Sequence, residues 1–181
     1  MSRNRVVLGL MLALTLPSIL SAQEYEEYYG SRGGYVVALN VYGACVAVTE
    51  ISYSDIYGEE YPAAIAFGVL EIEGRVGSML GLSSASFSMT MGDARRGTIS
   101  FDASEYEAFY MADSHQMFTA YMEFERIEQI MYSEKADLNL FDGTYIELPL
   151  DGTLSASELV LDCAEDHIIA EPGHHDPFSG R

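Results

Sequence analysis

The sequence predicts a mainly β domain, either an antiparallel β-sandwich or a partial barrel, with one or two short helices. Three observations support this fold class. Runs rich in Val, Ala, Tyr and Phe recur between glycine-containing turns from residue 35 onward. The stretch ASFSMTM, residues 85–91, alternates apolar and hydroxyl-bearing side chains, which is the period of a half-buried strand. Asp142-Gly143 stands between two extended runs, as in a two-residue hairpin turn.

The first half of the predicted domain consists of strands. Residues 35–53 form one bent strand or two consecutive strands, because Gly43 interrupts an otherwise extended run. Residues 62–74 carry apolar side chains on both faces, as expected of a strand buried between two layers. The strand predicted at 85–91 and the alternating run at 97–101 are joined by GDARRG, which predicts a hairpin. The apolar face of that hairpin consists of Ala85, Phe87, Met89, Met91, Ile99 and Phe101.

The second half mixes both kinds of element. Residues 115–134 fit one helix, which would make the domain α+β, but we favour a strand through Phe124 followed by a helix near 124–134. Residues 136–150 form a hairpin around Asp142-Gly143. Pro149 has no backbone N–H to donate, so its strand lies at a sheet edge or ends there.

The stretch ELPLDGTLSASELVLDC predicts a short helix that ends in a cysteine. Ser155 and Glu158 have the spacing of a capping box at the amino-terminal end of that helix. Leu154 and Leu159 are spaced as a hydrophobic staple. Leu159, Val160 and Cys163 then share the face that is directed toward the core. Residues 164–181 contain two prolines and no sustained periodicity, which predicts a disordered tail.

The amino-terminal residues have the pattern of an export signal. Two arginines precede an uncharged apolar run, and Ala22 offers a small residue for cleavage, so residues 1–22 are interpreted as a signal peptide. An uncleaved anchor is the alternative, although the apolar run is short for a membrane span. Residues 23–34, QEYEEYYGSRGG, predict a flexible acidic leader before a single globular domain over 35–163. These features predict a periplasmic or secreted protein without stable membrane insertion after cleavage.

The charge of the chain excludes some classes of partner. The sequence has 9 basic and 28 acidic residues, a formal net charge of −19. Loss of Arg3 and Arg5 with the signal peptide leaves 7 against 28, or −21. Such a field repels nucleic acid and anionic lipid, so neither is an expected partner. The scattered acids favour a role in solubility, and attraction of a cationic partner or of divalent cations is the alternative. An envelope protein is a further candidate partner.

The two cysteines, Cys45 and Cys163, predict one disulfide, because an even count in an exported protein favours pairing. Two separate buried thiols are the alternative. A redox role is not favoured, since the two residues lack the spacing of a CxxC motif.

No residue is predicted to be catalytic, and no cofactor is expected. The weak metal candidates lie in the predicted tail, where Glu165, Asp166 and Glu171 accompany His167, His174, His175 and Asp176. Imidazole and carboxylate groups are ligands for zinc, but no HExxH or finger spacing supports such a site. Ser114 and His115 are neighbours without an orienting third group. Glu71 and Glu73 fall on one face of a strand, and a small carboxylate-based hydrolase acting on cell-wall or glycan material is the alternative function.

The order of elements from 124 to 163, together with Leu148, Leu150, Gly152 and Ala156, resembles the carboxy-terminal part of small exported proteobacterial proteins of the invasion-associated locus B type. The resemblance covers about a quarter of the chain, and extra cysteines common in that family are absent. It implies a β-sandwich-like envelope protein without enzymatic activity and transfers no catalytic residue. Export, the expected disulfide and the lack of a catalytic set of residues together predict an exported binding or structural module.

Overall fold

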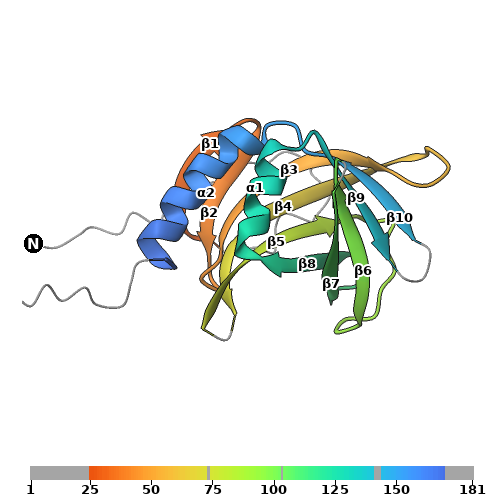
Figure 1. Cartoon of the computed structure of the whole chain (residues 1–181), viewed down its shortest axis with the longest axis horizontal. Coiled ribbons are helices and arrows are strands. Elements are labelled where there is room, and N and C mark those ends of the chain that lie inside the picture. The colour runs from red at the N-terminus through yellow and green to blue at the C-terminus, as the bar shows by residue number, and fades with distance from the viewer. Residues whose placement is uncertain (1–24, 73, 103, 141–143, 170–181) are drawn as a thin grey trace, which may run out of the picture.

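The computed structural model describes residues 25–72, 74–102, 104–140 and 144–169. These ranges form a barrel of antiparallel strands, a strand pair that extends from it, and helices packed at one end (Figure 1). The strands are β1 (Tyr25–Arg32), β2 (Tyr35–Asn40), β3 (Cys45–Ser54), β4 (Glu60–Ile72), β5 (Arg75–Ser83), β6 (Ala94–Phe101), β7 (Ser104–Ser114), β8 (Met117–Glu123), β9 (Lys135–Leu140) and β10 (Tyr145–Pro149). The helices are the 3₁₀ turn η2 (Phe124–Arg126), α1 (Ile127–Tyr132) and α2 (Thr153–His167).

Eight strands close the barrel. Their order is β3-β10-β9-β6-β7-β8-β5-β4, and β4 pairs back with β3 along its length. The expectation of a mainly β fold with two short helices is thus confirmed, and the architecture is a barrel rather than a sandwich. The strand through Glu123 followed by α1 is also confirmed, so the all-helical alternative over 115–134 is wrong.

The barrel interior is filled by alternate residues of its strands. Ile65, Phe67 and Val69 on β4 are fully buried, as are Ile99 on β6 and Leu138 on β9. The intervening side chains of each strand are directed outward, because successive side chains of a strand point to opposite faces. An eight-stranded barrel is just wide enough for its side chains to fill. Most of the described interior is therefore core.

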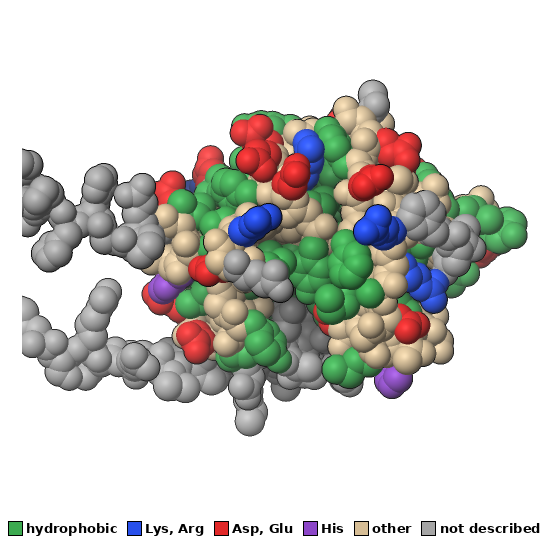
Figure 2. Space-filling view, turned by 60° about the horizontal axis from the view of Figure 1, so that its bottom comes forward, with side chains coloured by type: hydrophobic (Ala, Val, Ile, Leu, Met, Phe, Trp, Pro, Cys, Tyr) green, Lys and Arg blue, Asp and Glu red, His purple; other side chains and the backbone are tan. Residues whose placement is uncertain are grey.

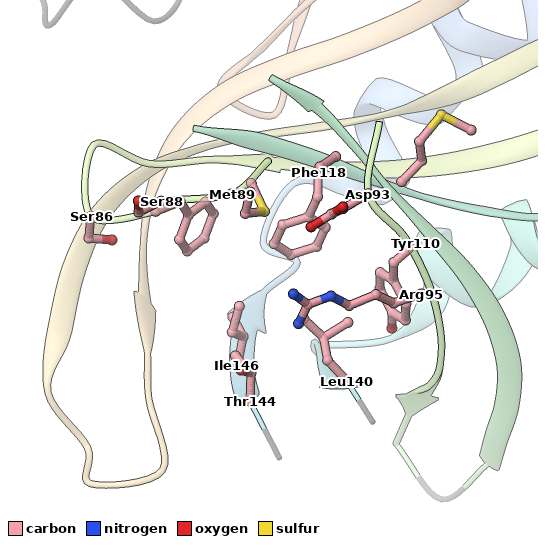
Figure 3. Close-up of a pocket in the computed structure, with 13 residues that line it drawn as sticks. Ser86, Ser88, Met89, Asp93, Arg95, Tyr110, Phe118, Leu140, Thr144 and Ile146 are labelled. Atoms are coloured by element: carbon pink, nitrogen blue, oxygen red, sulfur yellow. The ribbon is translucent and has the colours of Figure 1, made fainter. Parts of the chain in front are cut away.

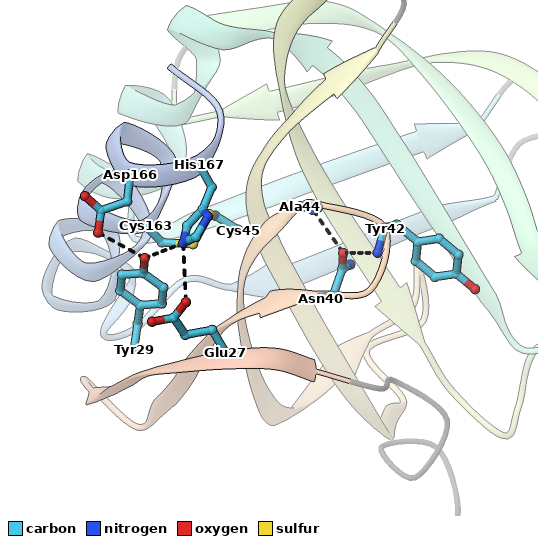
Figure 4. The surroundings of a disulfide bond; sticks show 9 residues. All are labelled: Glu27, Tyr29, Asn40, Tyr42, Ala44, Cys45, Cys163, Asp166 and His167. Atoms are coloured by element: carbon cyan, nitrogen blue, oxygen red, sulfur yellow. Dashed lines mark hydrogen bonds and ion pairs between the residues drawn. A yellow bond between two sulfur atoms is a disulfide. The ribbon is translucent and has the colours of Figure 1, made fainter. Parts of the chain in front are cut away.

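Strand β3 is shared between the barrel and the strand pair β1–β2. Its first residues, Cys45 to Val48, pair with β2, whereas Ser54 pairs with Glu147 of β10. The segment 35–53 is thus two strands, separated by a turn in which the Asn40 side chain accepts hydrogen bonds from the backbone N–H groups of Tyr42 and Ala44 (Figure 4). Strand β10 ends at Pro149, as predicted, and this end opens a gap beside the middle of β3.

The prediction of a flexible leader at 23–34 is wrong for its described part, because residues 25–32 form β1 and pair with β2. Strand β1 lies under α2 (Figure 1). Tyr29 packs against the core, and Arg32 forms an ion pair with Glu158 of α2. The acidic composition of the segment does not indicate a strand, and part of what stabilises β1 is contact with a helix more than 120 residues later in the chain.

The predicted closing helix exists, but its amino-terminal end is built differently. The helix begins at Thr153 after Gly152, so Ser155 lies within the first turn and does not cap it. Glu158 instead forms an ion pair with Arg32, and Leu154 is exposed. The predictions of a capping box and of a hydrophobic staple are therefore both wrong. The Thr153 hydroxyl contacts the Ile130 and Leu150 carbonyl oxygens at 2.8 Å each and docks the helix on α1. The helix continues to His167, so the predicted tail starts later than residue 164. Residues 170–181 lie outside the described ranges.

The disulfide between Cys45 and Cys163 is present, with both residues fully buried and their Cα atoms 5.8 Å apart. It joins the first residue of β3 to the buried face of α2, which also carries Ala156, Val160 and Ala164. Helix α2 therefore covers the β1–β2 extension and the adjoining end of the barrel.

We expect replacement of both cysteines by alanine to lower the free energy of unfolding by about 3–5 kcal/mol, because the bridge restricts a long loop of the unfolded chain. The sequence separation is 118 residues. Urea denaturation of the oxidised wild type and of the double variant measures the difference. Wild-type protein in reductant is the control and should resemble the variant. Equal urea midpoints for oxidised and reduced wild type would show that the bridge contributes no stability.

We also expect Gly152→Ala to destabilise the protein by about 2–4 kcal/mol. Gly152 has a φ of 83°, and an added Cβ would collide with the backbone carbonyl of Gly33. Gly34→Ala is the matched control, because Gly34 has a φ of 86° with nothing within 4 Å of an added Cβ. This control isolates the cost of the left-handed backbone, about 1 kcal/mol. Thermal or urea unfolding compares the two, and an equal loss in both variants would contradict the close contact.

Candidate functional site

The two ends of the barrel differ in how they are closed. Helices α1 and α2 pack at the end where β4 and β8 finish and β5 and β9 begin (Figure 1). The opposite end, here called the mouth, carries the β3–β4 and β7–β8 turns and the segment 84–93 between β5 and β6. A cavity of about 270 Å³ lies at the mouth.

The segment 84–93 forms one wall of this cavity and is not the predicted strand. It runs through turns, and hydrogen bonds to the β7–β8 turn fix it in place. The Met89 N–H donates to the His115 carbonyl at 3.0 Å, and the His115 Nδ1 lies 2.6 Å from the Met89 carbonyl oxygen. Of the residues predicted to face inward on this strand, Phe87 and Met89 are partly buried and line the cavity, whereas Ala85 is exposed. Ser86 and Ser88, predicted to face outward, line the same cavity. Met91 is exposed, and the predicted hairpin is replaced by pairing of β6 with β7 and β9.

The floor of the cavity is apolar. Phe118, Leu140 and Ile146 line it from three different strands and are buried (Figure 3). The Tyr110 ring also lines it, but its hydroxyl donates to the Thr98 carbonyl at 2.8 Å, so that hydrogen is already used. Burial raises the pKa of the Tyr110 phenol well above its ordinary value, which keeps the ring neutral.

A chain of aromatic rings leads from the surface to this floor. Tyr61 stacks on Tyr53 with ring centres 5.3 Å apart, and Phe87 lies 5.5 Å from Tyr53. Phe87 in turn lies 5.5 Å from Phe118, whose ring meets Tyr110 edge-on at 5.8 Å. Such ring pairs favour fixed tilted or edge-on geometries. Their contacts therefore hold the apolar wall of the cavity in a defined shape.

The rim of the cavity is polar. Asp93 and Arg95 are exposed residues at the start of β6, and both side chains line the cavity (Figure 3). Ser86, Ser88 and Thr144 supply hydroxyl groups around them. An apolar floor with a few polar groups at its edge is the usual construction of a small-molecule site, and barrel mouths are a common place for one. The site can thus bind a small molecule whose apolar part enters and whose polar part stays at the rim.

A second cavity, of about 260 Å³, lies in the gap where β10 leaves β3. It is lined by Gly33, Thr49, Glu50, Ile51, Ser52, Pro149 and Asp151. The cavity forms because β10 pairs with β3 at one residue pair, Glu147 with Ser54, and then ends at Pro149. Because it lacks the enclosed apolar floor of the mouth, we assign it no ligand.

The predicted metal candidates are only partly described. His167 lies at the end of α2, where its Nε2 is 2.7 Å from the Tyr29 hydroxyl and 3.6 Å from Glu27 (Figure 4). The same hydroxyl donates a hydrogen bond to Asp166 at 3.1 Å. Burial is the largest cause that raises the pKa of Tyr29 to about 12, and the Asp166 carboxylate is the next. This group joins α2 to β1. Within the described ranges no three metal-binding side chains gather, and Glu171, His174, His175 and Asp176 lie outside them.

The other candidates do not come together. Glu71 is exposed near the helix-covered end of the barrel and lines neither described cavity, and Glu73 lies outside the described residues. The Ser114 hydroxyl accepts a hydrogen bond from the Gln116 N–H and so stabilises the β7–β8 turn. Burial raises the pKa of the Asp113 carboxyl at the nearby bulge, while its hydrogen bond from Thr119 opposes that shift.

The sequence did not indicate Asp93 and Arg95 as site residues. They lie in GDARRG, which has the composition of an ordinary charged turn. Phe118 and Tyr110 likewise look like core residues in the sequence. Only the arrangement of the strands brings these residues to one cavity. Compared with known proteins, the chain matches no family model, no curated protein and no solved structure.

We expect the free energy of unfolding to fall as the pH rises above about 10, because unfolded tyrosines ionise near their model value of 10.0 while buried Tyr110 stays protonated. Its folded pKa is raised, so its contribution to stability is complete below pH 10 and is lost above it. Tyr110→Phe should decrease this slope, and Tyr57→Phe, which alters an exposed ring, should not. Urea unfolding between pH 9 and 11 measures the slopes. Identical slopes for wild type and Tyr110→Phe would contradict the assignment.

Proposed function

We propose that this protein is an exported, non-enzymatic binding module, periplasmic or secreted, that holds one small molecule at the mouth of its barrel. The observation that carries the proposal is the cavity of about 270 Å³, with its buried apolar floor and polar rim. Its volume lies just below the range of about 300–1,000 Å³ that is typical of ligand sites, which favours a ligand smaller than a typical drug molecule.

The architecture supports this function. The helices and the disulfide stabilise one end of the barrel, while hydrogen bonds hold the segment 84–93 against the other. The cavity walls are thus fixed before a ligand arrives, and a preformed site loses less entropy on binding. The aromatic rings supply a large apolar contact area with little side-chain freedom.

Export is supported by the basic and apolar pattern of residues 1–22 and by the disulfide, which is typical of oxidising compartments. Neither helix in the described part of the chain combines the length and apolar character needed to cross a bilayer. The resemblance to the invasion-associated locus B type stays a prediction, as does a cationic or envelope protein partner. Figure 2 shows acidic side chains at several separate places on one face.

The hydrolase alternative has no specific support. It requires two carboxyl groups on opposite sides of a substrate cleft. Glu71 is exposed and lines neither described cavity. We therefore develop the binding function alone.

We expect a neutral aromatic probe, 2-phenylethanol, to shift the methyl resonance of Met89 in a saturable way, because Met89 lines the cavity. Ala112→Leu should abolish the saturable shift, since Ala112 is a buried lining residue and a larger side chain there fills the space. Ala85→Leu is the control, because Ala85 is exposed in the same segment and does not line the cavity. Titration by NMR measures all three proteins, and circular dichroism checks their fold. Saturable binding that survives in folded Ala112→Leu would place the ligand elsewhere.

A further inference from the structure

We propose that the ligand of the mouth cavity is an uncharged molecule with one aromatic ring and one hydroxyl group, of the chemical class of a simple aromatic alcohol. This inference rests on the proposed function and names the chemistry of its ligand. It starts from two observations at the mouth. Aromatic side chains line the cavity, and the buried polar side chains of the described residues already have hydrogen-bond partners within the protein.

Three polar side chains of the cavity wall already have partners. The Tyr110 hydroxyl donates to the Thr98 carbonyl at 2.8 Å, and the Ser86 hydroxyl lies 2.7 Å from the Tyr53 hydroxyl. Arg95 also interacts with another residue, so the site does not require a carboxylate on the ligand. A polar group of the ligand placed against the buried floor would lose its hydrogen bonds to water without finding new ones, which is costly. The enclosed part of the ligand is therefore apolar.

Aromatic rings surround the space that the ligand would fill. Phe87, Phe118 and Tyr110 line the cavity, and the centre of the Phe118 ring lies 5.5 Å from that of Phe87 and 5.8 Å from that of Tyr110. The Met89 side chain lines the same space, and a thioether contacts ring edges favourably. Paired rings gain about two- to tenfold in affinity beyond the burial of their area. An aromatic group is thus favoured over an aliphatic group.

The volume of the cavity limits the ligand to one ring with a short substituent. An enclosed apolar cavity of about 150 Å³ holds one benzene molecule. By the same measure, the mouth cavity of about 270 Å³ has room for about 11 non-hydrogen atoms. This number corresponds to a benzene ring with a substituent of about three to five atoms. Because the mouth opens to solvent, the end of that substituent reaches the polar rim.

The rim favours a hydroxyl group without a charge. Arg95 stays positively charged whatever its partner and repels an ammonium group, while Asp93 and the formal net charge of −19 repel a carboxylate. The Asp93 backbone is fixed, because its N–H donates to the Thr90 carbonyl and its carbonyl accepts from the Ala112 N–H. A carboxylate has several acceptor positions, so Asp93 can accept a hydrogen bond from a ligand hydroxyl at the rim (Figure 3).

The preference for an aromatic ring is tested with 2-phenylethanol and 2-cyclohexylethanol by calorimetric titration. We expect Phe87→Leu to lower the ratio of affinities that favours 2-phenylethanol by about threefold, because a ring contact is lost. Phe109→Leu is the matched control and should leave the ratio unchanged, since Phe109 is exposed on β7 and does not line the cavity. The difference in hydrophobicity between the two alcohols cancels, because it is the same for every variant.

The absence of charge is tested with phenethylamine and phenylacetate. We expect each to bind about three- to fivefold more weakly than 2-phenylethanol, which is the size of an exposed charge interaction. Added salt should decrease this difference and leave the affinity for 2-phenylethanol unchanged, because screening acts on the charged probes alone. A charged probe that binds as tightly as 2-phenylethanol at low salt would show that the ligand class is wrong.

The hydrogen bond at the rim is tested with ethylbenzene, which lacks the hydroxyl. Asp93→Ala should weaken the binding of 2-phenylethanol about threefold more than that of ethylbenzene, which is the size of one hydrogen bond at an exposed position. Glu107→Ala is the control, because Glu107 is exposed on β7 and does not line the cavity. Titration by NMR measures both probes, and circular dichroism checks the fold. An equal effect on both probes in folded Asp93→Ala would overturn the assignment of the hydroxyl.

The outcomes separate this inference from the proposed function. If a charged probe binds most tightly, or if Phe87→Leu leaves the ratio of the two alcohols unchanged, the inference is wrong and the binding site stands. If no probe binds and the Met89 methyl resonance does not move, the mouth cavity is not a site for molecules of this size. Both the inference and the proposed function are then overturned.

Discussion

The structure depends on the way β3 divides one of its edges between two partners. Its first residues pair with β2 and its last residue pairs with β10. The other edge pairs continuously with β4. This division lets one strand close the barrel and at the same time support the β1–β2 extension on which α2 lies. The disulfide leaves from Cys45, the first residue of the shared strand, so it stabilises both parts at their junction.

The junction also explains why the two ends of the barrel differ. Helix α2 is joined to β3 by the disulfide, to β1 by the pairing of Arg32 with Glu158 and to α1 through the Thr153 hydroxyl. These contacts hold the apolar face of α2 against one end of the barrel. At the mouth, the segment 84–93 packs against the β7–β8 turn and forms one wall of the cavity. The cavity thus lies at the end of the barrel that the two helices do not cover, beside the irregular segment 84–93.

The polar and apolar parts of the mouth come from different physical requirements. The floor residues are core residues, and their burial stabilises the barrel whether or not a ligand is present. Asp93 and Arg95 are exposed and are not needed to fill that core. Their position beside an open apolar cavity is one basis of the binding function that we propose. The carboxyl group with a raised pKa, Asp113, is at the β7–β8 bulge and does not line this cavity.

The sequence by itself determined the β character of the chain, the extended runs on both sides of Asp142-Gly143, the end of β10 at Pro149 and the change from strand to helix near residue 124. Each of these follows from local periodicity or from the backbone chemistry of proline. The pairing of the only two cysteines also needed no structure beyond the expectation of an oxidising compartment. Only the tertiary structure decided that 25–32 is a strand, that Gly152 and not Ser155 precedes the closing helix, and that 85–91 is a cavity wall. In each case the deciding contact comes from a distant segment. Tyr29 donates a hydrogen bond to Asp166, Gly152 packs against the Gly33 backbone, and the His115 side chain contacts the Met89 carbonyl oxygen. Local patterns do not encode such contacts, and the mouth cavity, which is assembled from several strands, depends on them most.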